Sequence, residues 1–157
     1  MSKLRGTDIE VDFIAAKSPV ISGLTATRSL NENESGSTIA LDRAAGIVLT
    51  LPAACTTGTW YEFVVNTSVT SNSYKVITGA GTELLIGEVI SIDTDTSNAV
   101  AAFTGNGSTH IAVTMNGTTT GGLKGTHFIA KKTSSTQWVI KGSNQGSGTV
   151  ATPFATS

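Results

Sequence analysis

Few side chains in this sequence have the type and spacing that metal binding requires. His110 and His127 are the only histidines, and neither has a second His, Cys or carboxylate at the spacing of a metal site. The segment DTDTSN at 93–98 pairs two aspartates as calcium loops do. However, an EF-hand loop beginning there would need glycine and glutamate where the chain has Asn98 and Thr104. We therefore expect solvated histidines, a polar turn at 93–98, and neither a metal site nor a cofactor.

Groups that could catalyse a reaction are equally sparse. Glu32 and Glu34 stand in the polar stretch NENES, where a solvated pair is more common than the acid–base dyad of a glycosidase. The chain has no G-x-S-x-G motif. Cys55, the single cysteine, has no partner for an intrachain disulfide and is expected to be a small packing residue. The sequence predicts a protein that is not an enzyme. Of the three functions that we consider for this chain, an enzyme such as a glycan depolymerase that uses Glu32 or Glu34 is the least favoured.

The composition indicates what these few polar groups are mounted on. The chain has 157 residues, of which only 13% are charged, against about 25% in an average globular domain. The difference is made up by 26 Thr, 17 Ser and 17 Gly. Threonine is β-branched and suits half-exposed strands, whereas serine and glycine suit turns. This composition is typical of an all-β protein, and the length is that of one domain.

Alternating apolar residues predict about ten short strands. The segments IVLTL (47–51) and TWYEFVVN (59–66) place Ile47, Leu49 and Leu51 on one strand face, and Tyr61, Phe63 and Val65 on another. GNGS after AVAAFT, and TSST after THFIAKK, each predict a hairpin. Gly87 marks a bulge or a close backbone approach within LLIGEVISI. Short strands separated by turns favour a single-domain antiparallel sandwich or barrel.

The chain divides into three parts. Residues 1–19 are expected to form an N-terminal arm, 20–142 the β domain, and 143–157 a Ser/Gly-rich C-terminal tail with Val150 and Phe154 as anchors. In the arm, Ile9, Val11 and Phe13 alternate with charged residues, as in a strand. Such a strand could join its own sheet or the edge of another chain, and the sequence does not choose between the two.

The charge of the chain argues against a nucleic-acid partner. The net charge is −1. Residues 121–157 contain no acid and four lysines, which are Lys124, Lys131, Lys132 and Lys141. We expect a solvated lysine face, because outward lysines over inward aromatics such as Phe128 and Trp138 are usual for a hairpin on a core.

A membrane partner is not expected either. The N-terminus is too charged for a signal peptide, and no apolar run approaches the about 20 residues that span a bilayer. The sequence therefore predicts a soluble product made in the cytoplasm.

Residues 24–79 resemble a pattern found in small virion structural proteins of tailed bacteriophages. The matching pieces are an acidic ESG turn at 34–36, TIALD at 38–42, GIVLTLPA at 46–53, YEFVV at 61–65 and YKVITG at 74–79. Proteins of this kind are head decoration (cement) proteins and, less often, tail or fibre modules. The matched motifs concern packing and turning, so the fold transfers more readily than the function.

The resemblance implies a β-rich, trimeric module on the outer surface of an assembled phage head, where it would stabilise contacts between capsomers. Its partners would be the major capsid protein and further copies of itself, and it would be located in the virion after synthesis in the host cytoplasm. Within this picture we expect the arm to contact the capsid through its apolar residues. These candidates are Leu4, Ile9, Val11, Phe13 and Ile14.

A second function remains open. The chain could be a carbohydrate- or host-surface-binding module of a phage tail fibre or capsid knob. Aromatic side chains on a surface would then stack on sugar rings, and the candidates are Trp60, Tyr74 and Trp138, although each is more often a core residue.

Overall fold

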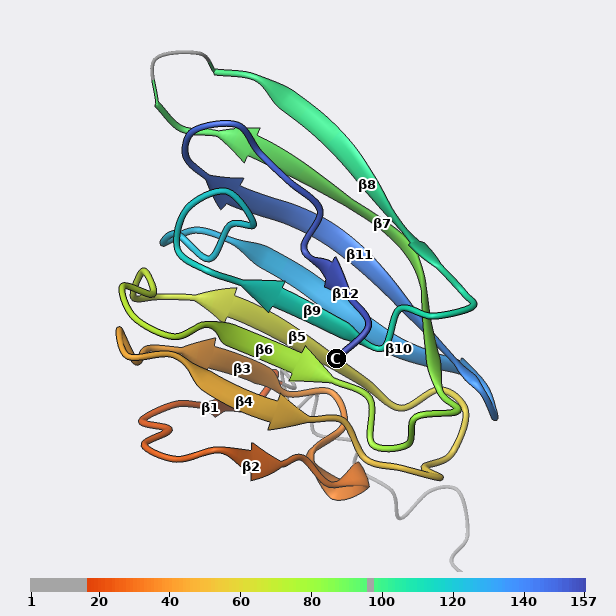
Figure 1. The fold of residues 1–157 in the computed structure, drawn as a ribbon. Coiled ribbons are helices and arrows are strands. Elements are labelled where there is room, and N and C mark those ends of the chain that lie inside the picture. Colours follow the sequence, from red (N-terminus) through yellow and green to blue (C-terminus); the bar gives the residue numbers. More distant parts are fainter. Residues whose placement is uncertain (1–16, 96–97) are drawn as a thin grey trace, which may run out of the picture.

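The computed structural model describes residues 17–95 and 98–157, which form a sandwich of two β-sheets (Figure 1). The all-β class expected from the sequence is confirmed. The seven-stranded sheet contains, in spatial order, β1 (Val20–Ile21), β3 (Thr38–Leu41), β5 (Trp60–Val65), β10 (His127–Ser134), β11 (Gln137–Gly146), β7 (Leu84–Asp93) and β8 (Val100–Asn106). The five-stranded sheet contains β12 (Phe154–Ala155), β9 (Ala112–Met115), β6 (Tyr74–Ile77), β4 (Ile47–Thr50) and β2 (Arg28–Ser29).

The first half of the chain is wound back and forth between the two sheets. Strands β1, β3 and β5 lie in the larger sheet, and β2, β4 and β6 lie in the smaller one. Because two successive crossings return the chain to the same sheet in the same direction, neighbours within each set are parallel. Strands β11 and β7 are also parallel, and the other five pairings are antiparallel. The expected antiparallel arrangement therefore holds for only half of the pairings, and the sheets are mixed.

Alternation along the strands places the core between the two sheets. Phe63 of β5 lies opposite Phe128 of β10, and their rings stack with centroids 5.0 Å apart. Each large apolar side chain buried in this way contributes about 1.5–3 kcal/mol. The residues expected to share a face in β4 and β5 are all buried. They are Ile47, Leu49 and Leu51, and Tyr61, Phe63 and Val65.

One predicted hairpin is confirmed and the other is wrong. Strands β10 and β11 pair on either side of Ser135 and Thr136. By contrast, GNGS connects β8 in the larger sheet to β9 in the smaller one. The side-chain oxygen of Asn106 accepts the backbone N–H groups of residues 108, 109 and 110, at 2.9–3.1 Å. Because these groups bind the side chain instead of an opposite strand, the chain leaves the first sheet here and crosses to the second.

The end of the chain is built into the sandwich. Strand β11 continues through residues 143–146, and β12 pairs with β9, placing Phe154 opposite Val113. Phe154 is 4% exposed and anchors this segment, as its apolar character suggested. Most of the expected tail therefore belongs to the two sheets or to the connection between them.

The described residues contain one short helix, the 3₁₀-helix η1 (Glu32–Glu34), within the polar stretch NENES at 31–35. Asn31 and Glu34 close it with reciprocal side-chain to backbone hydrogen bonds. No helix in the described residues has the length and hydropathy needed to cross a membrane.

Candidate functional site

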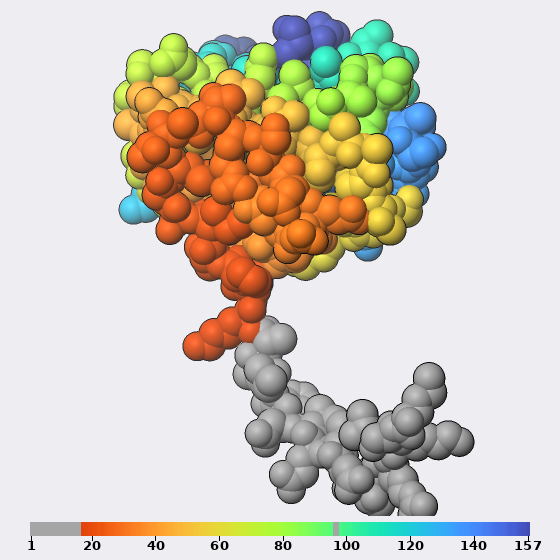
Figure 2. Space-filling model, turned by 90° about the horizontal axis from the view of Figure 1, so that it is seen from below, coloured from red at the N-terminus to blue at the C-terminus, as the bar shows by residue number. Residues whose placement is uncertain are grey.

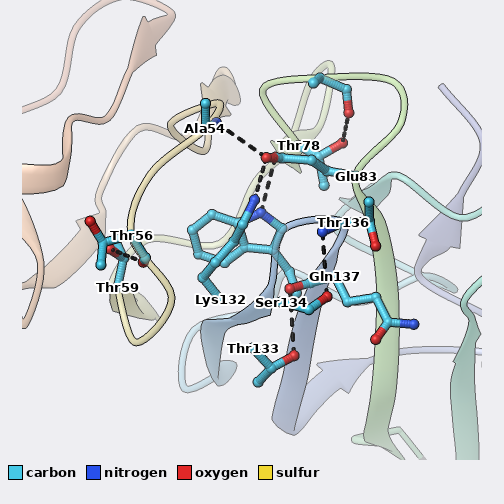
Figure 3. Close-up of polar contacts among 12 residues, drawn as sticks. Ala54, Thr56, Thr59, Thr78, Glu83, Lys132, Thr133, Ser134, Thr136 and Gln137 are labelled. Carbon is cyan, nitrogen blue, oxygen red and sulfur yellow. Dashed lines mark hydrogen bonds and ion pairs between the residues drawn. The ribbon is translucent and has the colours of Figure 1, made fainter.

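A buried ion pair lies at one end of the sandwich, where β10 ends and β7 begins, and Figure 3 draws its contact as a dashed line. Lys132 is the inward-facing residue near the end of β10, and its Nζ pairs with Oε1 of Glu83, just before β7. The two side chains are only 1% and 3% exposed. Trp138 donates its indole N–H to Oε2 of Glu83 at 3.1 Å, and the N–H of Ala54 reaches Oε1 at 3.3 Å. The carboxylate thus joins β10, β11 and the 52–59 loop.

This arrangement corrects the expectation that Lys132 belongs to a solvated lysine face. Its Nζ lies 5.3 Å from the centroid of the Trp138 ring, so the cation is shielded by an aromatic face as well as by the carboxylate. A charged lysine can be buried only when such partners are present. We infer a structural role, because the pair closes the end of the core.

A hollow of about 410 Å³ lies beside this end and is lined partly by Cys55 and Glu32. Burial raises the pKa of the Cys55 thiol, which keeps it protonated and weakly nucleophilic. Hydrogen bonds from Thr56 lower the pKa of Glu32, whose Oε1 accepts the Thr56 N–H at 2.9 Å. Glu34 instead pairs with Arg28. The two glutamates are therefore held by separate partners that stabilise the loops.

A second polar cluster crosses the outer face of the larger sheet. The carboxylate of Glu62 on β5 accepts a hydrogen bond from the Thr38 hydroxyl on β3 and lies 2.7 Å from Nε2 of His127 on β10. These contacts, that of Thr38 first, hold the pKa of Glu62 below its usual range. In a nucleophilic triad the imidazole stands between the hydroxyl and the carboxylate. Here the carboxylate stands in the middle, an arrangement that ties three strands together.

The outer face also exposes apolar side chains at its β7–β8 end. Val100 is 65% exposed, and Ile90 and Ile92 are 37% and 36% exposed. Ile92 lies opposite Val100 and Ile90 opposite the exposed Ala102, so these four residues are contiguous. We call them the β7–β8 patch. An exposed apolar cluster of this kind is typical of a surface that contacts another molecule.

The polarity of β7 is inverted over this patch. Its isoleucines face outward, whereas Ser91 and Asp93 face inward and are each 1% exposed. Ser91 contacts the side chain of Asn144 on β11 at 3.4 Å, and Asp93 accepts the N–H of Asp95 at 3.0 Å. A strand that serves only to cover a core has the opposite pattern. Over residues 90–93, β7 therefore turns its apolar side chains to the outer face and its polar ones to the interior.

An apolar hollow of about 300 Å³ lies farther along the same face. It is lined by Ile129, Val139 and Thr133, with Lys131 and Lys141 at its rim. Lys131 and Lys141 are exposed, as expected for the lysine face, and Lys141 lies 3.9 Å from Glu88. The outer face therefore combines apolar surface with scattered charge.

The residues predicted as site residues are placed separately. Leu4, Ile9, Val11, Phe13 and Ile14 lie outside the described residues, so their role stays a prediction. Trp138 and Tyr74 are fully buried, and the Tyr74 hydroxyl donates to the carbonyl of Thr67 at 2.9 Å. Trp60 is half-buried on β5. The structure therefore does not bring the three aromatic residues together on one surface.

In the described part of the chain, no three His, Cys, Asp or Glu side chains gather as a metal site would need. The two aspartates expected in a polar turn are held by backbone contacts, since the N–H of Gly148 donates to Asp95 at 2.7 Å. We found no match to this chain among family models, curated proteins or solved structures. The geometry thus defines a two-sheet β-sandwich that exposes apolar side chains on the outer face of its larger sheet.

Proposed function

We propose that this protein is a capsid decoration protein, a structural component of a phage virion that binds the outer surface of the assembled head. The observation that carries the proposal is the β7–β8 patch, where isoleucine and valine face solvent while Ser91 and Asp93 are buried. Burying such side chains against a partner is favourable by about 25 cal/mol per Å² of apolar surface. The likeness of residues 24–79 to virion structural proteins supplies the kind of partner.

Weak individual contacts through this surface would suffice for binding to a head. A shell repeats its binding sites many times, and a protein that bridges neighbouring capsomers gains avidity from simultaneous contacts. A rigid sandwich suits this role because little conformational entropy is lost when it docks. The partners are then the major capsid protein and further copies of this chain.

The N-terminal arm would provide a second attachment. Residues 17–20 are exposed, and Figure 2 shows the first described residues, coloured red, standing out from the rounded body. Residue 17 therefore lies at the surface. The arm expected at 1–19, with Ile9, Val11 and Phe13, would contact a neighbouring subunit.

The proposal is tested by binding to phage heads that lack this protein. The Ile90→Lys, Ile92→Lys double variant places two charges in the contact surface, and we expect its occupancy on heads to fall at least about tenfold. The matched control is Ser135→Lys, Thr136→Lys, which adds the same charges at the exposed β10–β11 turn. Equal binding by both variants, or no binding by the wild-type protein, would contradict the proposal.

The arm is tested separately. Deleting residues 1–17 should leave a folded sandwich that no longer binds heads, and unchanged occupancy would refute the role of the arm. Quantifying the protein in purified virions distinguishes a decoration protein, whose copies scale with the capsomers, from a fibre module present in few copies.

A further inference from the structure

Strand β8 is the one long open edge among the described strands. Four strands lie at the edges of the two sheets, and β1, β2 and β12 are two residues long. β8 extends over seven residues and lies at the outer edge of the larger sheet (Figure 1). Proteins usually keep edge strands short or otherwise protect them, because open backbone groups pair readily with another strand.

The pairing of β8 with β7 shows which backbone groups are open. The N–H of Asp93 donates to the carbonyl of Ala99 at 2.8 Å, and the N–H of Gly107 donates to that of Leu85 at 3.0 Å. In an antiparallel ladder, hydrogen-bonded pairs recur at every second residue. In this register, therefore, Ala101, Phe103 and Gly105 direct their N–H and C=O groups to β7.

The alternate residues direct theirs away from the sheet. These are Val100, Ala102 and Thr104, whose backbone groups make no hydrogen bond within the described residues. Their side chains are exposed on the outer face. The edge VAAFTGN has no charge and no proline, and its register with β7 is uninterrupted. Among the described residues, this edge therefore has no charge, proline or bulge to protect it from pairing.

We propose that β8 pairs with β8 of a second copy of this chain, forming an antiparallel homodimer. A two-fold axis perpendicular to the sheet at Ala102 places Ala102 opposite its counterpart and Val100 opposite Thr104 of the second copy. All three residues then find partners for both backbone groups, so the edge is self-complementary. The small outward side chains leave room for the approach, and Val100 loses part of its exposure.

This pairing also joins the two β7–β8 patches. An axis perpendicular to the sheet keeps the outer faces of both copies on the same side, so that Val100 and Ala102 of each copy meet at the seam. A two-fold assembly differs from the trimer that the resemblance to decoration proteins implies. The inference does not depend on the proposed function, because it rests on the edge alone.

Sedimentation of the full chain over a range of concentrations tests the inference. We expect a dimer for the wild-type protein, and for Ala102→Pro a dissociation constant at least about tenfold higher, because proline removes an N–H on both sides of the seam. That N–H faces away from β7, so the variant should keep its fold, which circular dichroism and thermal unfolding verify. Ala102→Lys should act similarly by placing like charges opposite each other.

Ser135→Lys is the matched control, because it adds the same charge at an exposed turn far from β8 in sequence, and it should remain dimeric. In a Cys55→Ser background, Ala102→Cys should form an intermolecular disulfide under mild oxidation, whereas Ser135→Cys should not. A wild-type monomer at every concentration, a trimer, or a dimer that Ala102→Pro and Ala102→Lys leave intact would overturn the inference. A dimer that is lost on deleting residues 1–17 would also overturn it, because the edge would then be paired with the N-terminal arm.

Discussion

The Lys132 ammonium and the Glu83 carboxylate form an ion pair that solvent scarcely reaches, between strands of one sheet and the loop that follows β4. The indole of Trp138 covers the cation and also donates to the carboxylate. Two charges in such a place are tolerated because each satisfies the other, and the loss of either leaves a buried charge without compensation.

Replacing Lys132 with methionine should lower the free energy of unfolding by about 3–5 kcal/mol, because Glu83 would remain buried without its cation. Denaturant titration followed by tryptophan fluorescence measures the change. Lys131→Met is the matched control, since Lys131 is exposed on the outer face, and its effect should stay within about 0.5 kcal/mol. Equal effects of the two substitutions would show that the buried pair has no special role.

Glu62 should make stability depend on pH at the acid end. Its pKa is lowered by the hydrogen bond from Thr38 and by His127, so this stabilisation is present above about pH 4.5 and is lost as the pH falls through the lowered pKa. Thr38→Val removes the largest cause and should raise the pKa of Glu62 and flatten the acid dependence. An NMR titration of the side-chain carboxyl measures the pKa. Thr133→Val serves as control, and an identical Glu62 pKa in Thr38→Val would contradict the prediction.

Gly87 should not tolerate a side chain. Its φ is +94°, and a Cβ would lie 2.2 Å from the carbonyl oxygen of Ile140 on the neighbouring strand β11. Gly87→Ala should therefore cost more than about 1 kcal/mol of stability, measured by thermal or denaturant unfolding. A Cβ on Gly81 would meet nothing within 4 Å. Gly81→Ala should leave stability nearly unchanged, and a similar loss in both variants would argue against the close approach.

Local pattern was sufficient to predict most of the strands and, for β4 and β5, which face is buried. The alternation in β4 and β5 reflects a requirement of each strand by itself, because successive side chains point to opposite sides. The β10–β11 hairpin and the turn at η1 were also predictable from short-range signals. Gly87 was recognised as a special position, and the uninterrupted register of β7 shows that it is a close approach rather than a bulge.

Relations between distant segments could not be predicted in this way. The parallel neighbours arise from winding between sheets, which no local pattern records. GNGS has the composition of a hairpin, but the contacts of Asn106 and the partners of β9 decide where the chain goes. Lys132 looked like a surface lysine because Glu83, its partner, lies 49 positions away in the sequence. The alternation in ISID (90–93) is visible in the sequence. Whether the isoleucines or the polar residues face the core depends on which face of the sheet the other strands cover.

The winding of the first half has a consequence for how the molecule would carry load. A pull applied through the chain before residue 17 enters β1 first and then β2, which are two-residue strands at the perimeters of their sheets. Their hydrogen bonds would break in succession, so the chain would lengthen by one turn of the winding at a time. Strands β10 and β11, which are interior to the larger sheet and follow the wound half in the chain, would be loaded only after that half had come apart. Tension on the N-terminus would thus be relieved by gradual extension while the rest of the body keeps its shape.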